Sequence, residues 1–172
     1  MWSRSTRPYK ASRNYHENGR SETDNGDFQG HKSALILRAA CALVQTKYYP
    51  KEVVDFFCQH HSKEHILDGI ASGNMGVLFE NGAIVGTGCF DNNHITGLYV
   101  LPTYQKQGFG SYIMDCLEME ISKKFDVAVL DASLPAVFLY EHRGYKTVGH
   151  GIYELENDVK LVYEVMEKKL KN

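Results

Sequence analysis

A glycine-containing segment is the sharpest chemical signal in the chain: Gln105-Lys106-Gln107-Gly108-Phe109-Gly110-Ser111. It lies between a predicted strand and a predicted helix, and the first turn of a helix has unpaired N–H groups and a partial positive charge. Gly108 and Gly110 have no Cβ atoms that would keep an anion away from those amides. The pattern therefore predicts a backbone site for a pyrophosphate, with Lys106 adding positive charge. The alternative is a glycine loop that only turns the chain.

Two common phosphate-binding motifs are excluded by the residues that follow. A Walker loop needs Gly-Lys-Ser/Thr, which is absent after Gly110. A dinucleotide-binding fingerprint needs a third glycine where this chain has Ile113.

Further motifs flank the glycine segment in a fixed order. Leu98-Tyr99-Val100-Leu101-Pro102 precedes it, and Leu130-Asp131-Ala132-Ser133 and Leu139-Tyr140-Glu141-His142-Arg143-Gly144-Tyr145 follow. In this order the chain resembles the GCN5-related N-acetyltransferases (GNAT family). Their pattern is a strand, then Gln/Arg-x-x-Gly-x-Gly/Ala opening a long helix, then a strand and a short helix bearing a tyrosine before Gly-aromatic. The resemblance extends from about residue 77 to the C-terminus.

The resemblance implies roles for individual residues. The backbone of two central strands that splay apart would pair with the pantetheine arm of acetyl-CoA, through Leu98, Tyr99 and Val100. Pyrophosphate would be held by the amides of Gln105, Lys106, Gln107, Gly108, Phe109, Gly110 and Ser111. Tyr140 would protonate the leaving thiolate, although a core aromatic with a bonded hydroxyl is its structural alternative. Ser133 stands where the family often has an asparagine that bonds the pantetheine.

The implied reaction is acetyl transfer from acetyl-CoA to a primary amine, by direct attack in a ternary complex. An aliphatic amine has a pKa near ~10.4, so it must lose a proton before it attacks. The acceptor stays open between a small molecule and a protein amine. The rival hypothesis is a non-catalytic acyl-CoA sensor that uses the same cleft, followed by a scaffold without a ligand.

The general base cannot be assigned from the sequence. Family members often place a glutamate in the strand before the phosphate loop, whereas this strand offers only His94 and Thr96. His94 is one candidate, acting through water, and Glu80 and Asp91 are the others. Each of these residue types is more often a solvated surface group.

Other reactive side chains predict less. His60, His61 and His65 form a local cluster, in which His61 and His65 lie one helical turn apart. Zinc sites use that spacing, but no third ligand for such a pair is apparent, and no metal site is predicted. Cys116 lies inside a predicted amphipathic helix and is expected to be a buried thiol rather than a nucleophile.

An aromatic stretch lies where the family builds its acceptor pocket. Its rings are Tyr48, Tyr49, Phe56 and Phe57. We expect most of them in the core and one or two in the pocket wall. The acidic side chains that would attract a cationic amine are Glu52, Asp55 and Glu64.

The elements that position these residues follow from hydrophobic periodicity and turn signals. Helices are predicted for Leu35–Val44, from Pro50, after Ser62, for Ser111–Lys124 and for Pro135–His142. Strands are predicted for residues 77–80, 83–90, 94–101, 127–131, 145–154 and 160–166, with Asn81-Gly82 as a hairpin turn. In the long helix Ile113, Leu117 and Ile121 should face the core, and Asp115, Glu118 and Glu120 should face outward.

These elements predict a mixed α/β (α+β) fold, with a mostly antiparallel twisted sheet flanked by helices. The strand–helix–strand step at its centre predicts one parallel pair. Residues 32–172 would form this N-acetyltransferase domain. Residues 1–31 are polar, which predicts a tail that is at least partly mobile, with Ser5–Lys10 as a candidate edge strand.

Composition limits the class of partner and the compartment. A net charge of -2 argues against a non-specific nucleic-acid binder. The most apolar stretch is too short to span a membrane, and the N-terminus lacks the apolar core of a signal peptide. The four cysteines are scattered, which favours free thiols in the cytoplasm. A homodimer is compatible with these features.

Overall fold

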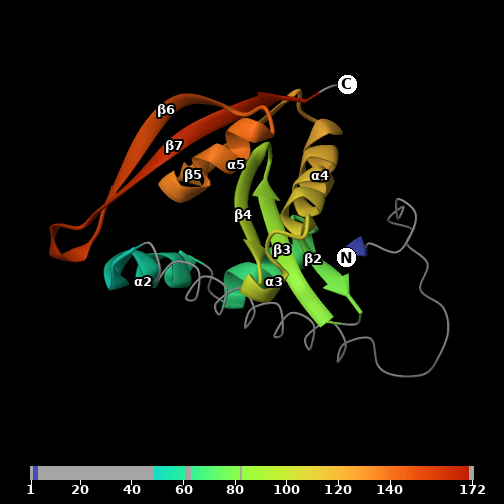
Figure 1. The fold of residues 1–172 in the computed structure, drawn as a ribbon, viewed down its shortest axis with the longest axis horizontal. Helices are drawn as coiled ribbons and strands as arrows, with labels where there is room; N and C mark the ends of the chain where they lie inside the picture. The colour runs from blue at the N-terminus through green and yellow to red at the C-terminus, as the bar shows by residue number, and fades with distance from the viewer. Residues whose placement is uncertain (1, 4–48, 61–62, 82, 171–172) are drawn as a thin grey trace.

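A computed structural model describes residues 2–3, 49–60, 63–81 and 83–170. The predictions for Leu35–Val44, Ser5–Lys10 and Ser62 lie outside the described residues. In the described part, seven strands form one mixed sheet in the order β1-β2-β3-β4-β5-β7-β6. Figure 1 shows α4 and α5 on one side of this sheet, and α2 and α3 on the other.

The helices and strands have the following bounds. The helices are α2 (Lys51–His60), α3 (Lys63–Ser72), α4 (Phe109–Ser122) and α5 (Val137–His142), with 3-10 turns at Pro102–Tyr104, Leu134–Ala136 and Glu156–Asp158. The strands are β1 (Trp2–Ser3), β2 (Met75–Glu80), β3 (Ala83–Asp91), β4 (His94–Val100), β5 (Val127–Ser133), β6 (Lys146–Glu154) and β7 (Lys160–Lys169).

The predicted meander and parallel pair are both found. β2, β3 and β4 pair antiparallel in sequence, and β4 pairs parallel with β5 across the α4 connection. Asn81 occupies the predicted hairpin turn with φ 49°, a left-handed conformation that asparagine tolerates. β1 pairs parallel with β2 and starts earlier than the predicted edge strand. The fold class is therefore confirmed, and most predicted element ends shift by a few residues.

The main core lies between α4 and the sheet. Ile113, Leu117 and Ile121 are at most 1% exposed, as their one-turn spacing predicts. A smaller cluster on the opposite face joins Ile66 of α3 to Met75 and Cys89. The two clusters pack against the two faces of the sheet at β3 and β4, so these strands give the neighbouring site a firmly packed support.

One outward-facing residue of α4 was predicted wrongly. The side chain of Glu118 is only 12% exposed, because Arg143 and Lys168 bind its carboxylate from other elements. Periodicity within one helix assigns a carboxylate to the solvent side and contains no information about partners that arrive from distant segments. Cys116 likewise is half-buried rather than buried, although burial still raises the pKa of its thiol.

Candidate functional site

The two central strands separate after a very short contact. β4 and β5 share only the pairs His94↔Val129 and Ile95↔Leu130. The separation begins at Thr96, where the pairing of β4 with β3 shifts from Phe90↔Ile95 to Cys89↔Gly97. Thr96 is therefore an extra bulge residue in β4, and a bulge bends its strand and ends regular pairing. The chain itself builds the splayed strands that the family resemblance requires.

Backbone groups of β4 turn into the space that β5 has left. The Leu101 amide donates to the Val85 carbonyl of β3 at 2.9 Å. Because bonded and non-bonded pairs alternate along antiparallel strands, Tyr99 also turns its backbone to β3, and Leu98 and Val100 turn theirs away from it. The Val100 carbonyl accepts the side-chain amide of Gln105 at 3.1 Å. Of the three residues predicted to pair with pantetheine, Leu98 and Val100 thus have the suitable backbone direction, and Tyr99 offers its side chain.

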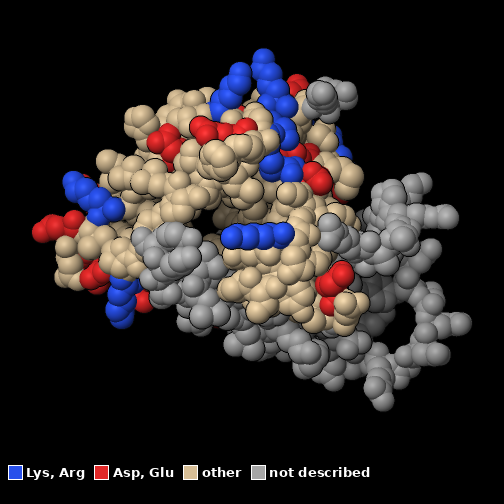
Figure 2. Space-filling view, in the orientation of Figure 1, with Lys and Arg blue, Asp and Glu red and all other residues tan. Residues whose placement is uncertain are grey.

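A cavity of about 230 Å³ occupies the separation between β4 and β5. Figure 2 shows a hollow near the middle of this face, where Figure 1 draws the gap between β4 and the β5–α5 segment. The cavity brings together six of the predicted site residues: Leu98, Tyr99, Val100, Gln105, Ser133 and Tyr140. The remaining predicted residues, 106–111, continue from Gln105 into the start of α4 and do not line this cavity.

The glycine segment forms the turn that opens α4. Lys106 and Gly108 have φ values of 60° and 83°, and Gly108 is the N-cap of the helix without a side-chain cap. The first intrahelical bond runs from the Tyr112 amide to the Gly108 carbonyl, so helix geometry leaves the amides of the first turn pointing outward. Phe109, 4% exposed, packs its ring on Tyr104 and anchors the turn to the core. The side chains of Lys106, Gln107 and Ser111 are exposed around this turn.

Glycine at position 110 is not required by the packing of the protein itself. A Cβ atom there would lie 3.8 Å from a Val100 methyl group, which is ordinary contact, and Gly110 has no positive φ. Any need for a small residue at this position must therefore come from something that approaches the helix from outside.

Tyr140 stands on α5 at the wall of the cavity. Its ring packs edge-on against Tyr145, with centroids 5.9 Å apart. Burial raises the pKa of Tyr140 to about 12, and the positive charge of Arg143 opposes this rise. The phenol is therefore protonated throughout the neutral range, as a proton donor must be.

His94 lies at the point where β4 and β5 begin to separate. Its Nε2 atom is 3.4 Å from the Asp131 carboxylate, and Asp131 lines the cavity. His94 itself does not line the cavity and is connected to it through Asp131. Glu80 and Asp91, the other candidate bases, lie at the β2–β3 and β3–β4 turns and do not line it either. Asp131 was missed as a candidate because its strand reads as an apolar segment, and only the parallel pairing brings it next to His94.

Aromatic side chains from α2, β6 and β7 also line the cavity. Phe57, from the predicted aromatic stretch, lines it together with Tyr153 and Tyr163. The two tyrosines stack with centroids 5.0 Å apart, and Phe56 lies 5.0 Å from Tyr153. Tyr48 lies outside the described residues. The contribution of β6 and β7 was missed, because the alternation that predicted both strands does not tell which neighbour their faces meet.

Two negative findings apply to the described residues. They contain no group of three or more His, Cys, Asp or Glu side chains able to hold a metal ion, and His61 of the predicted cluster lies outside them. None of their helices is long and apolar enough to cross a membrane.

This arrangement fits an extended ligand that carries a diphosphate. The slot between β4 and β5 offers backbone groups, the first turn of α4 offers outward amides, and a protonated phenol stands at the wall. The family model for the acetyltransferase (GNAT) domain matches residues 44–163. The chain belongs to the GNAT family. Membership confirms the predicted class, an acyltransferase with acetyl-CoA as co-substrate.

Solved GNAT structures have the same fold at low sequence identity. A GNAT protein from Rhodopseudomonas palustris superposes with a TM-score of 0.72 at 23% identity, covering 83% of this chain and 91% of that one. The YncA protein of Salmonella typhimurium, solved with acetyl-CoA, gives 0.65 at 14% identity, with 85% and 91% covered.

A curated relative matches the sequence more closely over a shorter stretch. The catalytic subunit NAA20 of the N-terminal acetyltransferase B complex of Arabidopsis thaliana is 32% identical over 87 residues. The match covers 47% of this chain and 48% of the relative, so the chain spans about half the length of that protein.

Proposed function

We propose that this GNAT-family chain transfers an acetyl group from acetyl-CoA to a primary amine while both substrates are bound. The observation that carries the proposal is the separation of β4 from β5 after Ile95. It produces a cavity with backbone donors and acceptors on one wall and Tyr140 on another.

The binding roles divide along this slot. Leu98 and Val100 would bond the pantetheine amides through their backbone groups, as an added strand does. The amides of the first turn of α4 would hold the diphosphate, with Lys106 beside them. Ser133, on the β5 side of the cavity, would add one hydroxyl, and Tyr99 would contribute its ring.

The chemistry needs one proton acceptor and one proton donor. We propose that His94 and Asp131 together accept the proton of the incoming ammonium, directly or through a water in the cavity. The amine nitrogen then bonds to the carbonyl carbon, and the carbon–sulfur bond breaks. Tyr140 donates its proton to the leaving thiolate, and the second proton that the nitrogen loses as the amide forms returns to the Tyr140 phenolate. Holding both substrates in one slot supplies much of the rate, roughly 7–11 kcal/mol at best.

The acceptor proposed for first testing is the α-amino group of a protein or peptide. NAA20 carries N-terminal acetyltransferase in its name, and a structural neighbour is the ribosomal-protein-S18-alanine N-acetyltransferase of Escherichia coli. The wall of Phe57, Tyr153 and Tyr163 offers apolar surface for the first side chain of such a peptide. Free thiols at Cys58, Cys89 and Cys116 agree with a cytoplasmic location, which stays a prediction together with a homodimer.

A panel assay tests the proposed function. Release of coenzyme A would be measured with peptides that differ in their first residue, with N-terminally blocked lysine peptides and with small polyamines. Turnover on one class supports amine acetylation and identifies its acceptor. Binding of acetyl-CoA without turnover on any amine would instead support the acyl-CoA sensor.

The Asp131→Asn and His94→Gln variants test the proposed proton acceptor. We expect each to lower kcat about tenfold at neutral pH, less than the 10²–10⁴-fold that a complete general base contributes, because each variant keeps the other member of the pair. The loss should shrink as the pH approaches the pKa of the acceptor, about 8 for an α-amine, because more of the amine is already deprotonated. The measurement is a pH profile of kcat for each variant.

Matched controls are available on the neighbouring turns. Glu80→Gln and Asp91→Asn remove carboxylates that do not line the cavity and should leave the profile unchanged. A loss in Asp131→Asn that is the same at every pH would contradict the role in proton transfer.

A further inference from the structure

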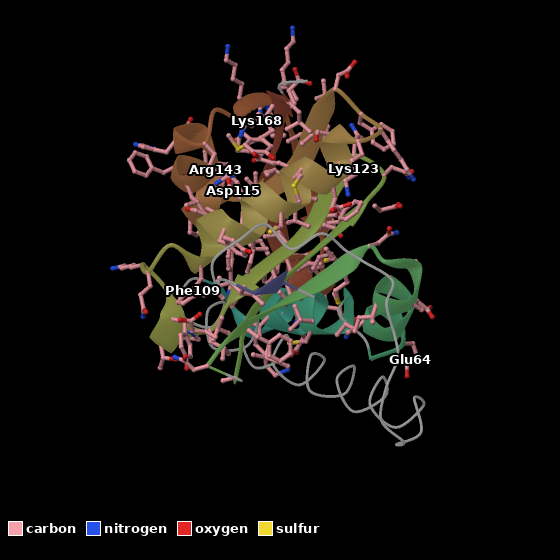
Figure 3. The ribbon with its side chains drawn as sticks, turned by 90° about the vertical axis from the view of Figure 1, so that its right-hand side faces the viewer. Glu64, Phe109, Asp115, Lys123, Arg143 and Lys168 are labelled. Atoms are coloured by element: carbon pink, nitrogen blue, oxygen red, sulfur yellow. The ribbon has the colours of Figure 1, made fainter. Side chains whose placement is uncertain are left out.

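A partly buried ion cluster joins α4 to the segment that follows α5 and to β7. It consists of Asp115, Glu118, Arg143 and Lys168, and Figure 3 shows Arg143, Asp115 and Lys168 gathered beside α4. Arg143 donates to both oxygens of Glu118, through Nε at 3.1 Å and Nη2 at 3.0 Å. Lys168 donates to the same carboxylate at 2.7 Å. Two cations thus neutralise Glu118, and although burial alone would raise its pKa, their hydrogen bonds hold the pKa below its usual range.

Arg143 makes two further contacts along α4, in addition to those with Glu118. Its Nη2 atom also donates to Asp115 at 2.7 Å, and its Nη1 atom donates to the Ser111 carbonyl at 3.2 Å. Ser111 is the last residue of the glycine segment proposed to bind the diphosphate. One guanidinium group therefore holds the first turn of α4 and the two turns that follow it.

The helix that carries Tyr140 has few anchors of its own. α5 has six residues, and its Phe138 and Leu139 are 70% and 47% exposed. Val137 and Tyr140 are the α5 residues that pack against the main core. The C-terminal end of α5 is fixed by the chain that follows, since the Tyr140 carbonyl accepts the amides of Arg143 and Tyr145, both at 3.0 Å.

The Arg143 side chain adds a directional polar tie from this end to α4, beside the apolar packing of Tyr140 and Tyr145 on the main core. It is only 15% exposed, and its planar fork binds a carboxylate at two points, which fixes direction as well as distance. Lys168 reaches Glu118 from β7 and leaves the position of α5 undetermined. Through its bond to the Ser111 carbonyl, Arg143 connects the end of the helix that carries Tyr140 to the start of α4.

We propose that Arg143 is a positioning residue, which holds the Tyr140 phenol in register with the diphosphate-binding turn of α4. The proposal rests on the proposed acetyl transfer, and it extends the functional site to a side chain outside the cavity. Arg143 acts through Tyr140 and touches neither substrate.

A double-mutant cycle tests whether Arg143 acts through Tyr140. Arg143→Gln should lower kcat about tenfold and change the Kd of coenzyme A less than twofold, and Arg143→Lys should recover part of the loss. In a Tyr140→Phe background the same Arg143→Gln change should cost less than twofold, since coupled residues are not additive. Equal losses in both backgrounds would overturn the proposal. If Arg143→Gln does not fold, Arg143→Lys takes its place in the cycle.

The matched control is Asp115→Asn. The side chain of Asp115 is 68% exposed and provides one of the four Arg143 contacts, so this variant should keep kcat within twofold of the wild type. A loss in Asp115→Asn as large as in Arg143→Gln would show that general weakening of α4 explains the effect.

Hydrogen exchange gives a readout that does not depend on turnover. Amides of residues 137–145 should exchange at least tenfold faster in Arg143→Gln than in Asp115→Asn, because the end of α5 loses its tie. Unchanged exchange would overturn the positioning role even if no amine is a substrate. If the wild type binds acetyl-CoA without turnover on any amine, while Arg143→Gln still shows the faster exchange, only the proposed reaction is overturned and the positioning role stands.

Discussion

Replacing Tyr140 by phenylalanine should lower kcat about 100-fold, with a change in the Kd of acetyl-CoA of less than twofold. The substitution removes only the phenolic oxygen, and general acids typically contribute 10²–10⁴-fold to the rate. The ring that packs on Tyr145 and the core is retained, so the fold should be unaffected. Steady-state kinetics with the best acceptor, together with calorimetric titration of coenzyme A, measures both quantities.

The pH dependence adds a second check on Tyr140. Because burial raises its pKa to about 12, the wild type should show no Tyr140-dependent fall in kcat until the pH approaches that value. Below it the phenol keeps its proton and remains a donor. A Tyr140→Phe variant with undiminished kcat would assign the ring to the core alone.

The Gly108→Ala variant should weaken coenzyme A binding about tenfold. Gly108 has φ 83°, where a residue with a Cβ atom is strained by about 1–2 kcal/mol. Relief of that strain would turn the amides at the start of α4 away from the diphosphate, and a lost hydrogen bond to a charged group costs about 1.5–3 kcal/mol. Calorimetric titration of coenzyme A, alongside denaturant unfolding, separates the loss of affinity from the loss of stability.

Gly73→Ala is the matched control for this backbone effect. Gly73 has φ 78° and nothing within 4 Å of an added Cβ, and it lies at the end of α3, away from the glycine segment. Both variants should lose similar stability, but only Gly108→Ala should lose affinity. An equal loss of affinity in the two variants would mean that the α4 turn is not the diphosphate site.

Local patterns in the sequence predicted the helices and strands better than they predicted the contacts between them. The stripe of Ile113, Leu117 and Ile121 predicted the buried face of α4, because residues three and four apart share one side of a helix. The Asn81 turn predicted the β2–β3 hairpin for an equally local reason.

The features that escaped prediction depend on long-range pairing. The Thr96 bulge is one extra residue in the register between β3 and β4, and it leaves no mark on hydrophobic alternation within β4. Glu118 was placed in solvent because Arg143 follows it by 25 positions. Asp131 and His94 meet only through the parallel pairing of their strands. In the candidate site, the sequence thus predicted the glycine turn and Tyr140 as residues of interest, and tertiary structure supplied their partners.

Because β4 and β5 pair over so short a stretch, the sheet divides into two halves that share only a narrow line of contact. One half contains β1 to β4 and the other contains β5, β7 and β6, and two residue pairs join them. A molecule lying in the slot would complete the missing backbone bonds and so act as a removable strand. We therefore expect the unliganded protein to open along this line more readily than anywhere else in the sheet. A molecule bound in the slot should make both halves of the sheet more rigid at once.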